Sequence, residues 1–120
     1  MNNIQTIHET GTVAAKKAVS DYLAEWTAKT GGNQYGEPMY CGFANVRIRP
    51  ARGRFVQFLK AEGIGSSGWN GGYTVSYYDM MRNQPYGHTQ SMDIKEHGCD
   101  AFAEVLRKHG MDAHMESRAD

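Results

Sequence analysis

The sequence contains few cysteines and prolines, has no long apolar run and carries no net charge. Its two cysteines, Cys41 and Cys99, lie too far apart for a Cys-x-x-Cys metal or redox motif. The 13 basic and 13 acidic residues cancel, which argues against a protein that coats long nucleic acid, because such binding needs a large basic surface. Nothing resembles a signal peptide or a membrane span, so we expect a reduced, cytoplasmic protein with no membrane contact.

Motifs for catalysis are also absent from the sequence. Acyl or thiol chemistry needs a nucleophile beside a positioned base, and neither a Gly-x-Ser-x-Gly elbow nor a catalytic cysteine signature occurs. The segments that follow His88 and His114 do not match the paired motifs of two-histidine phosphoesterases. No Walker loop or dinucleotide fingerprint is present. The sequence therefore favours binding over catalysis, with no metal and no cofactor.

The length of 120 residues and the apolar content of 40% predict a single globular domain, 1–120. Apolar residues at helical spacing between positions 12 and 30 predict a helix within an N-terminal segment, 1–30. A Gly-rich linker at 31–39 contains Pro38 near its end and is expected to let this helix stand apart from the rest. An α+β core then occupies residues 40–120.

Within the core, hydrophobic periodicity predicts two helices and four strands. Residues 40–49 alternate as a strand with Gly42, Ala44, Val46 and Ile48 on one side, and residues 51–62 form a helix. Strands at 72–78 and 88–92 are expected to pair as a hairpin. The last helix begins with Asp93 as N-cap and ends before Gly110, and a strand at 111–116 closes the chain.

This order predicts an α+β protein with a ferredoxin-like βαββαβ core, preceded by the N-terminal helix. Such a core has an antiparallel sheet with two helices on one face. The open face is expected to receive Phe43, Asn45, Arg47, Tyr73 and Tyr77. An uncovered sheet face is typically used for a ligand, a second subunit or an added helix. The N-terminal helix is a candidate cover, in the same chain or in a partner, and we expect a homo-oligomer.

Positive charge is concentrated in one segment, because residues 38–61 contain no acidic side chain. Arginines 47, 49, 52 and 54 lie on both sides of Pro50, and Arg52 and Arg54 are expected in the first turn of a helix. Free backbone N–H groups, the helix dipole and guanidinium groups together attract phosphate or carboxylate. A solvated basic face is the alternative. A small anionic ligand suits this local charge better than a long nucleic acid does.

Aromatic residues are frequent between positions 63 and 87, where small polar residues surround them. Rings beside guanidinium groups suit a nucleobase, although tyrosines in hairpins also pack across strands. Trp69 is flanked by Gly68, Asn70 and Gly71 and has no obvious core to fill, so it is the first choice for stacking, with Tyr73 second.

Polar residues complete the predicted site. Gln90 precedes a helix N-terminus, and Asn45 lies on the expected open face, so both are candidates to hydrogen-bond the polar edge of a base. Arg118 follows the last strand and would contact an anion or form a salt bridge with the chain's own acids. The predicted ligand-binding residues are Asn45, Arg47, Arg52, Arg54, Trp69, Tyr73, Gln90 and Arg118.

Four short runs resemble small accessory proteins of tailed bacteriophages: CGFANV at 41–46, PARGRF at 50–55, QSMDIKE at 90–96 and SRAD at 117–120. The resemblance spans residues 41–120 and excludes the first helix. It supplies no catalytic residues. It implies a context in which small phage proteins act by binding, including sequestration of the nucleotide signals that bacterial immune systems produce.

The sequence leads to one main hypothesis and two alternatives. The main hypothesis is non-covalent binding of a small phosphorylated ligand, a nucleotide or a cyclic oligonucleotide, by a homo-oligomer. The first alternative is single-stranded nucleic-acid binding on the open sheet face, with affinity that rises with strand length and falls steeply with salt. The second is a protein-interaction module whose aromatic and basic faces are buried against a partner.

Overall fold

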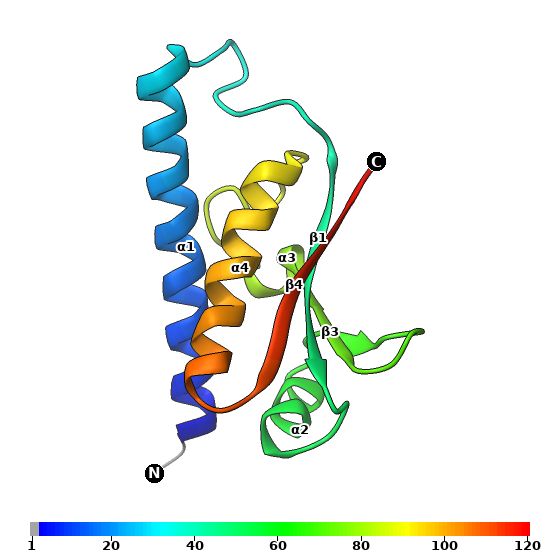
Figure 1. Cartoon of the computed structure of the whole chain (residues 1–120). Coiled ribbons are helices and arrows are strands. Elements are labelled where there is room, and N and C mark those ends of the chain that lie inside the picture. The colour runs from blue at the N-terminus through cyan, green and yellow to red at the C-terminus, as the bar shows by residue number, and fades with distance from the viewer. Residues whose placement is uncertain (1–2) are drawn as a thin grey trace.

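The computed structural model describes residues 3–120, and its helices pack on one face of an antiparallel sheet (Figure 1). The strands lie in the order β2-β3-β1-β4, and each neighbouring pair is antiparallel. No helix in this range is long and apolar enough to cross a membrane. In chain order the elements are α1 (Asn3–Thr30), β1 (Gly42–Arg49), α2 (Arg54–Ala61), β2 (Ser66–Ser67), β3 (Tyr73–Ser76), α3 (Tyr77–Met80), α4 (Met92–Lys108) and β4 (Asp112–Ala119).

Strand β1 is the central strand, and its alternation confirms the prediction for this segment. Ala44, Val46 and Ile48 are buried on the side of the helices, while Phe43 on the opposite face is about half exposed. Apolar side chains at every second position bury together because successive side chains of a strand point to opposite faces. Helix α2 adds Phe55 to the same core. The other face of the sheet, which carries Phe43, is called the open face below.

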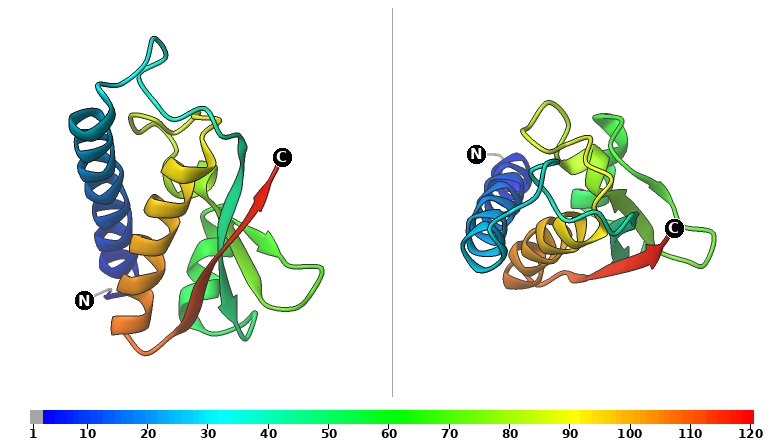
Figure 2. Two further views of the ribbon diagram at one scale, coloured as in Figure 1. Left: turned by 45° about the horizontal axis from the view of Figure 1, so that its top comes forward. Right: turned by 90° about the horizontal axis from the view of Figure 1, so that it is seen from above.

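Helix α1 is longer than predicted and lies against α4 rather than on the open face (Figure 2). It buries Val19 and Leu23 in the shared core. The ring of Phe102 in α4 packs directly on the backbone of α1 at Gly11, where an added Cβ atom would lie 2.9 Å from it. The helix therefore does not cover the open face of its own sheet, and it is part of the core rather than an independent arm.

The predicted hairpin of 72–78 with 88–92 is wrong. Strand β3 ends at Ser76, whose side chain accepts a hydrogen bond from the backbone N–H of Asp79 at 3.0 Å and so caps the short helix α3. The hairpin partner of β3 is β2. In residues 88–92, only Ser91 makes a bridge, to Cys41. The cap formed by Ser76 therefore ends β3, although the alternation of tyrosines predicts that the strand continues to residue 78.

Helix α4 confirms the strongest helical pattern in the sequence, with Cys99, Phe102 and Leu106 fully buried. Its N-cap is Ser91, not Asp93: the Ser91 hydroxyl accepts a hydrogen bond from the N–H of Ile94 at 3.4 Å. Strand β4 then pairs with the whole of β1 and extends beyond the predicted end at residue 116.

Candidate ligand site on the open sheet face

A hollow of about 520 Å³ lies on the open face of the sheet, and we call it the sheet-face hollow. Strands β1 and β4 form its floor, and the loop between β2 and β3 forms one wall. The hollow brings together four of the predicted ligand-binding residues, although they are far apart in the sequence. These four are Asn45, Arg47, Trp69 and Arg118.

Arg47 is only 8% exposed, and its guanidinium is already bound within the protein. Its Nε donates to the Glu116 carboxylate at 2.7 Å, and its Nη1 donates to the backbone carbonyl of Gly71. The hydrogen bond from Arg47, with a second from Asn45, lowers the pKa of Glu116, and the same bond to Glu116 raises the pKa of Arg47. Arg47 therefore holds the β2–β3 loop instead of offering a free charge to phosphate.

Glycines let this loop lie against β1. A Cβ atom at Gly68 would overlap the guanidinium of Arg47. Gly72 has a φ of 74° and comes so close to β1 that a Cβ atom there would lie 2.9 Å from the carbonyl oxygen of Ile48. Because only glycine adopts this conformation without strain, the Gly-rich composition fixes the position of the loop rather than making it loose.

Two aromatic rings and one free guanidinium face the solvent at this hollow. The side chain of Trp69, on the β2–β3 loop, is 94% exposed, and Phe43 is 51% exposed. The guanidinium carbon of Arg118 lies 5.7 Å from the centroid of the Phe43 ring, and Lys95 Nζ lies 5.1 Å from it. Among residues 3–120, Arg118 has no carboxylate partner, so the salt bridge considered for it is absent there.

Gln90 lies in a second hollow, of about 310 Å³, beside the first. The two hollows share Phe43 and Asn45, so Asn45 lies between Gln90 and Trp69 across strand β1. Lys95 also lines the second hollow and donates to the backbone carbonyl of Gly42 at 2.7 Å. The hollow that Gln90 lines therefore adjoins the hollow that contains Trp69, and Asn45 lines both.

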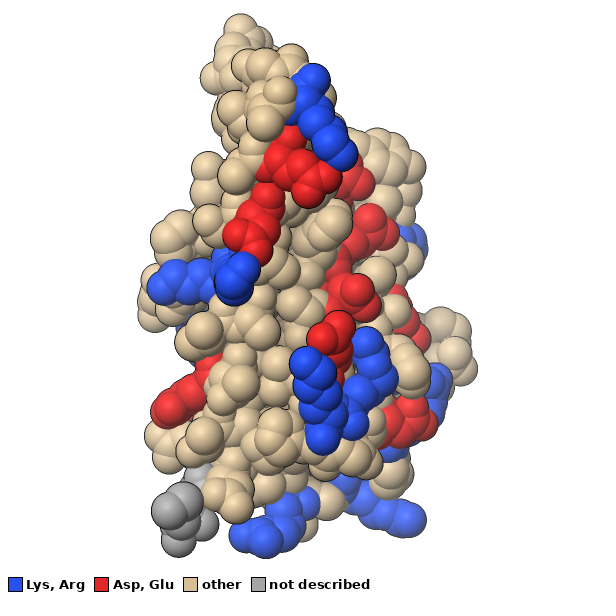
Figure 3. Space-filling model, turned by 60° about the vertical axis from the view of Figure 1, so that its left-hand side comes forward, with Lys and Arg blue, Asp and Glu red and all other residues tan. Residues whose placement is uncertain are grey.

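Arg52 and Arg54 lie apart from Arg47, so the predicted convergence of the arginines around Pro50 holds for Arg49, Arg52 and Arg54 but not for Arg47. They line a separate cleft of about 390 Å³, the α2 cleft, together with Arg49 and His109. The reason is local: Arg47 still belongs to β1 and projects to the open face, whereas Arg52 precedes α2 and Arg54 begins it. Basic side chains also gather at the lower end of the face over α1 and α4, at the height of α2, below a band of mixed charge (Figure 3).

Tyr73 is not available for stacking because it is only 3% exposed. It pairs with Ile48 in the β1–β3 ladder, which places it on the helix face of the sheet. Its hydroxyl donates to the carbonyl of Ile64 at 2.6 Å, and burial raises the pKa of this tyrosine. Tyr77, the other tyrosine expected on the open face, is buried in α3.

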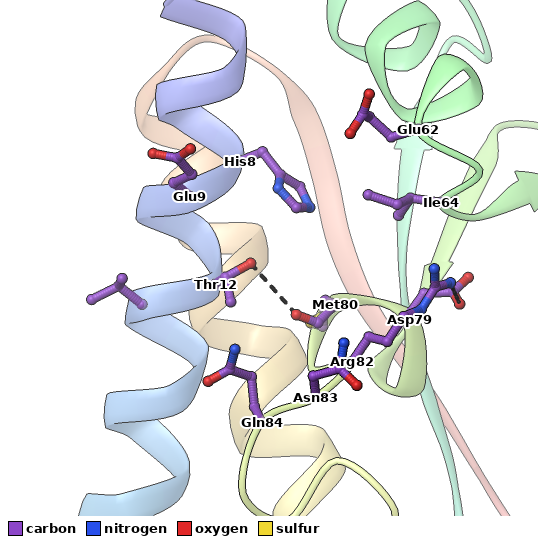
Figure 4. Close-up of a pocket in the computed structure, with 11 residues that line it drawn as sticks. His8, Glu9, Thr12, Glu62, Ile64, Asp79, Met80, Arg82, Asn83 and Gln84 are labelled. Carbon is purple, nitrogen blue, oxygen red and sulfur yellow. Dashed lines mark hydrogen bonds and ion pairs between the residues drawn. The ribbon is translucent and has the colours of Figure 1, made fainter.

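The sequence interpretation missed a hollow of about 460 Å³ between α1 and the turn after α3 (Figure 4). The ring of His8 projects toward this hollow between Phe58 and Phe102, with ring centroids 5.6 and 5.8 Å away. Its Nε2 is buried without a hydrogen-bond partner among the described residues, and burial lowers its pKa. Helical spacing of Ile7 with Gly11 and Ala15 was a usable signal, since it extends α1 toward residue 8.

Cys99 and the possible metal ligands of residues 3–120 are not arranged for thiol or metal chemistry. Cys99 is fully buried, and this burial raises the pKa of its thiol. Residues 3–120 contain no group of three or more His, Cys, Asp or Glu side chains placed to hold a metal ion. No family model, curated protein or solved structure matches the chain.

Proposed function

We propose that the protein binds a small phosphorylated ligand, a nucleotide or a cyclic oligonucleotide, without covalent chemistry in the sheet-face hollow. The observation that carries this proposal is the 94% exposure of Trp69 on a loop that Arg47 holds against the sheet. A large ring exposed on a fixed loop is prepared to stack on a base, at little entropic cost on binding. Stacking of one base on an aromatic side chain contributes about 1–3 kcal/mol.

Each residue of the hollow has a separate role in this proposal. Trp69 stacks on the base, and Arg118 binds phosphate because no carboxylate in residues 3–120 neutralises it. Asn45 donates to Glu116 Oε1 at 3.4 Å, which leaves its amide oxygen to accept a hydrogen bond from a base. Arg47 positions the loop, and its charge is balanced by Glu116.

We also propose that the core is ferredoxin-like, with β2 reduced to two residues. Support comes from the strand order β2-β3-β1-β4, from the antiparallel pairing and from helices α2 and α4 within the βαββαβ sequence of elements. The resemblance of residues 41–120 to phage accessory proteins extends the functional proposal to sequestration of a nucleotide signal. Sequestration needs tight binding without turnover, which agrees with a site built from stacking and charge.

A thermal-shift panel tests the function with mononucleotides, cyclic di- and trinucleotides and short single-stranded RNA. We expect at least one phosphorylated compound to raise the melting temperature, because a ligand that binds only the folded state stabilises it. Trp69→Ala should remove the shift without changing the melting temperature of the free protein. Tyr35→Ala is the matched control, since Tyr35 is 60% exposed but lies outside the hollow. A panel without any shift, or a shift that survives Trp69→Ala, would contradict the proposal.

A second candidate is single-stranded nucleic acid, which the continuity of the two adjoining hollows favours. The two hollows share Phe43 and Asn45 and extend from Trp69 to Gln90, so successive bases of one strand could occupy them in turn. This function predicts affinity for oligonucleotides that increases with strand length and decreases steeply with salt. Length-independent binding of a mononucleotide or cyclic compound favours the first proposal instead.

A further inference from the structure

We propose that the outer edge of β4 pairs with β4 of a second copy, so that two sheets join into one continuous antiparallel sheet. In the described chain β4 is the last strand of the sheet and pairs only with β1. Figure 2 shows it at the outer margin of the sheet, with no element beyond it in the view from above. An eight-residue edge with free backbone groups is a template for another strand.

The backbone of β4 presents four of its residues to this edge. Asp120 donates its N–H to the carbonyl of Cys41 at 3.2 Å, toward β1. The carbonyl of Ala113 instead accepts from the Arg107 side chain at 2.8 Å, away from β1. Since these directions alternate along a strand, the backbone groups of Ala113, Met115, Ser117 and Ala119 face outward. The Ala113 carbonyl retains a second lone pair for a partner strand.

The side chains of β4 on the open face alternate in charge and are self-complementary. Asp112, His114, Glu116 and Arg118 share this face, because they pair with Arg49, Arg47, Asn45 and Phe43 of β1. In an antiparallel pair centred on Met115, Asp112 lies opposite the partner's Arg118. His114 lies opposite the partner's Glu116. Within one chain, Asp112 Oδ1 already lies 2.9 Å from His114 Nε2 and Glu116 accepts from Arg47, so the contacts with a partner add to these pairs. A two-fold axis repeats both pairs, so the Asp112–Arg118 pair of opposite charge occurs twice and each His114 faces a carboxylate of the partner.

The same pattern disfavours the neighbouring registers. A slip of two residues in one direction places Asp112 opposite the partner's Glu116 and His114 opposite its own copy. The slip in the other direction places Glu116 opposite its own copy and His114 opposite the partner's Arg118. Like charges directly opposite each other destabilise a strand pair, so one register is selected. The central register also matches outward-facing residues with each other, Ala113 with the partner's Ser117.

The dimer goes beyond the proposed function, since it requires no ligand. A two-fold axis perpendicular to the sheet places both open faces on the same side, with one sheet-face hollow in each copy. In the dimer the partner's Asp112 is a carboxylate partner for Arg118, so contact with phosphate then depends on the remaining N–H donors of its guanidinium and not on an unpaired charge. Trp69 lies on the β2–β3 loop, away from β4, and Trp69→Ala should therefore leave the dimer intact while it removes ligand binding.

Sedimentation equilibrium of the full chain with charge-swap variants tests this interface. We expect the wild type at low ionic strength to have twice the 13.4 kDa monomer mass and to dissociate as salt screens the pairs. Asp112→Arg alone and Arg118→Asp alone should each give monomers. The double variant Asp112→Arg/Arg118→Asp restores opposite signs and should restore the dimer. Circular dichroism checks that each variant is folded.

The matched control is Asp100→Arg, which makes the same charge change at an exposed position on α4 and should leave the dimer unchanged. A wild-type chain that remains monomeric up to its solubility limit would overturn the proposal. A double variant that stays monomeric while folded would also overturn it, because the two charges would then not face each other. A dimer that persists in both single variants assigns the interface to another surface and equally rejects this one.

Discussion

For Arg47, the sequence predicts the direction of the side chain but not its binding partner. Alternation along β1 correctly places its side chain opposite Val46 and toward the open face. Its partner Glu116 lies 69 residues further along the chain, so no local pattern identifies the ion pair. A basic residue that looks available for phosphate is therefore neutralised by the fold, whereas Arg118, one residue before the end of β4, remains without a carboxylate partner in residues 3–120.

Trp69 is the opposite case, because its neighbours alone determine its exposure. Its immediate neighbours, Gly68 and Asn70, followed by Gly71 and Gly72, are small or polar residues typical of a loop. The structure agrees with that expectation for Trp69. Tyr73, four positions later, was assigned to the wrong face because the pairing of β3 with β1 sets its orientation. Local composition thus predicts exposure in loops better than it predicts the face of a short strand.

His8 should make the stability of the protein depend on pH. An unfolded histidine titrates near pH 6.5, and burial lowers the pKa of His8 in the fold, partly offset by Glu9 and Glu62. Between these two pKa values the unfolded chain binds more protons, so the free energy of unfolding decreases as pH falls below about 6.5. His8→Phe should weaken this dependence and add about 1 kcal/mol at neutral pH, since it removes an unpaired buried nitrogen.

Urea titrations between pH 5.5 and 7.5 measure this effect. His88→Phe serves as the control at an exposed position and should keep the slope of the wild type. Identical pH dependence in His8→Phe and the wild type would show that His8 is not the source.

At the level of elements, α4 and β1 are predicted well because their own side chains bury one complete face. Elements whose ends depend on caps are predicted less well. Ser76 and Ser91 each cap a helix through a side-chain oxygen, and both lie where the tyrosine and polar patterns predicted strands. The residues around a serine that caps a helix can be the same as those around a serine within a strand. Tertiary packing therefore decides which of the two structures forms.

Gly98 marks a close contact between α4 and α3 that a single methyl group should disturb. A Cβ atom there would lie 2.7 Å from Cε1 of Tyr77 and 3.3 Å from Cγ2 of Val19. Tyr77 is fully buried and its hydroxyl donates to the carbonyl of Tyr86 at 2.9 Å, so its ring has little room to move. We expect overpacking in Gly98→Ala to cost about 1–3 kcal/mol before the gain in helix propensity is subtracted.

This cost opposes the gain in helix propensity of about 1 kcal/mol that alanine gives over glycine. Chemical denaturation should therefore yield a lower midpoint for Gly98→Ala at an unchanged m-value. Asp100→Ala, at an exposed position of the same helix, is expected within about 0.5 kcal/mol of the wild type. A midpoint for Gly98→Ala equal to or above that of the control would mean that the Tyr77 ring moves aside without cost.

At the scale of the whole molecule, the segments that the composition separates or joins are not the ones that the fold separates or joins. The Gly-rich segment at 31–39 looks like a linker to a detached helix. In the structure, however, α1 lies along α4 and buries its apolar side chains there (Figure 1). The basic run likewise looks continuous, but the turn at Pro50 separates Arg47 on the open face from Arg54 at the α2 cleft. Composition describes a segment, whereas the path of the chain determines which surfaces the segment joins.

Because α1 is part of the core, its removal should unfold the rest of the chain. Three of its buried side chains, Ile7, Val19 and Leu23, each contribute about 1.5–3 kcal/mol, or about 5–9 kcal/mol together. A domain of this size has a total stability of about 5–15 kcal/mol. We therefore expect a fragment of residues 40–120 to lose cooperative thermal unfolding, as measured by circular dichroism and calorimetry. A peptide of residues 1–34 added in trans should restore the transition, while the same peptide with Val19→Asp should not. A fragment that unfolds cooperatively at the temperature of the full chain would instead mean that residues 40–120 form a complete core and that α1 does not stabilise it.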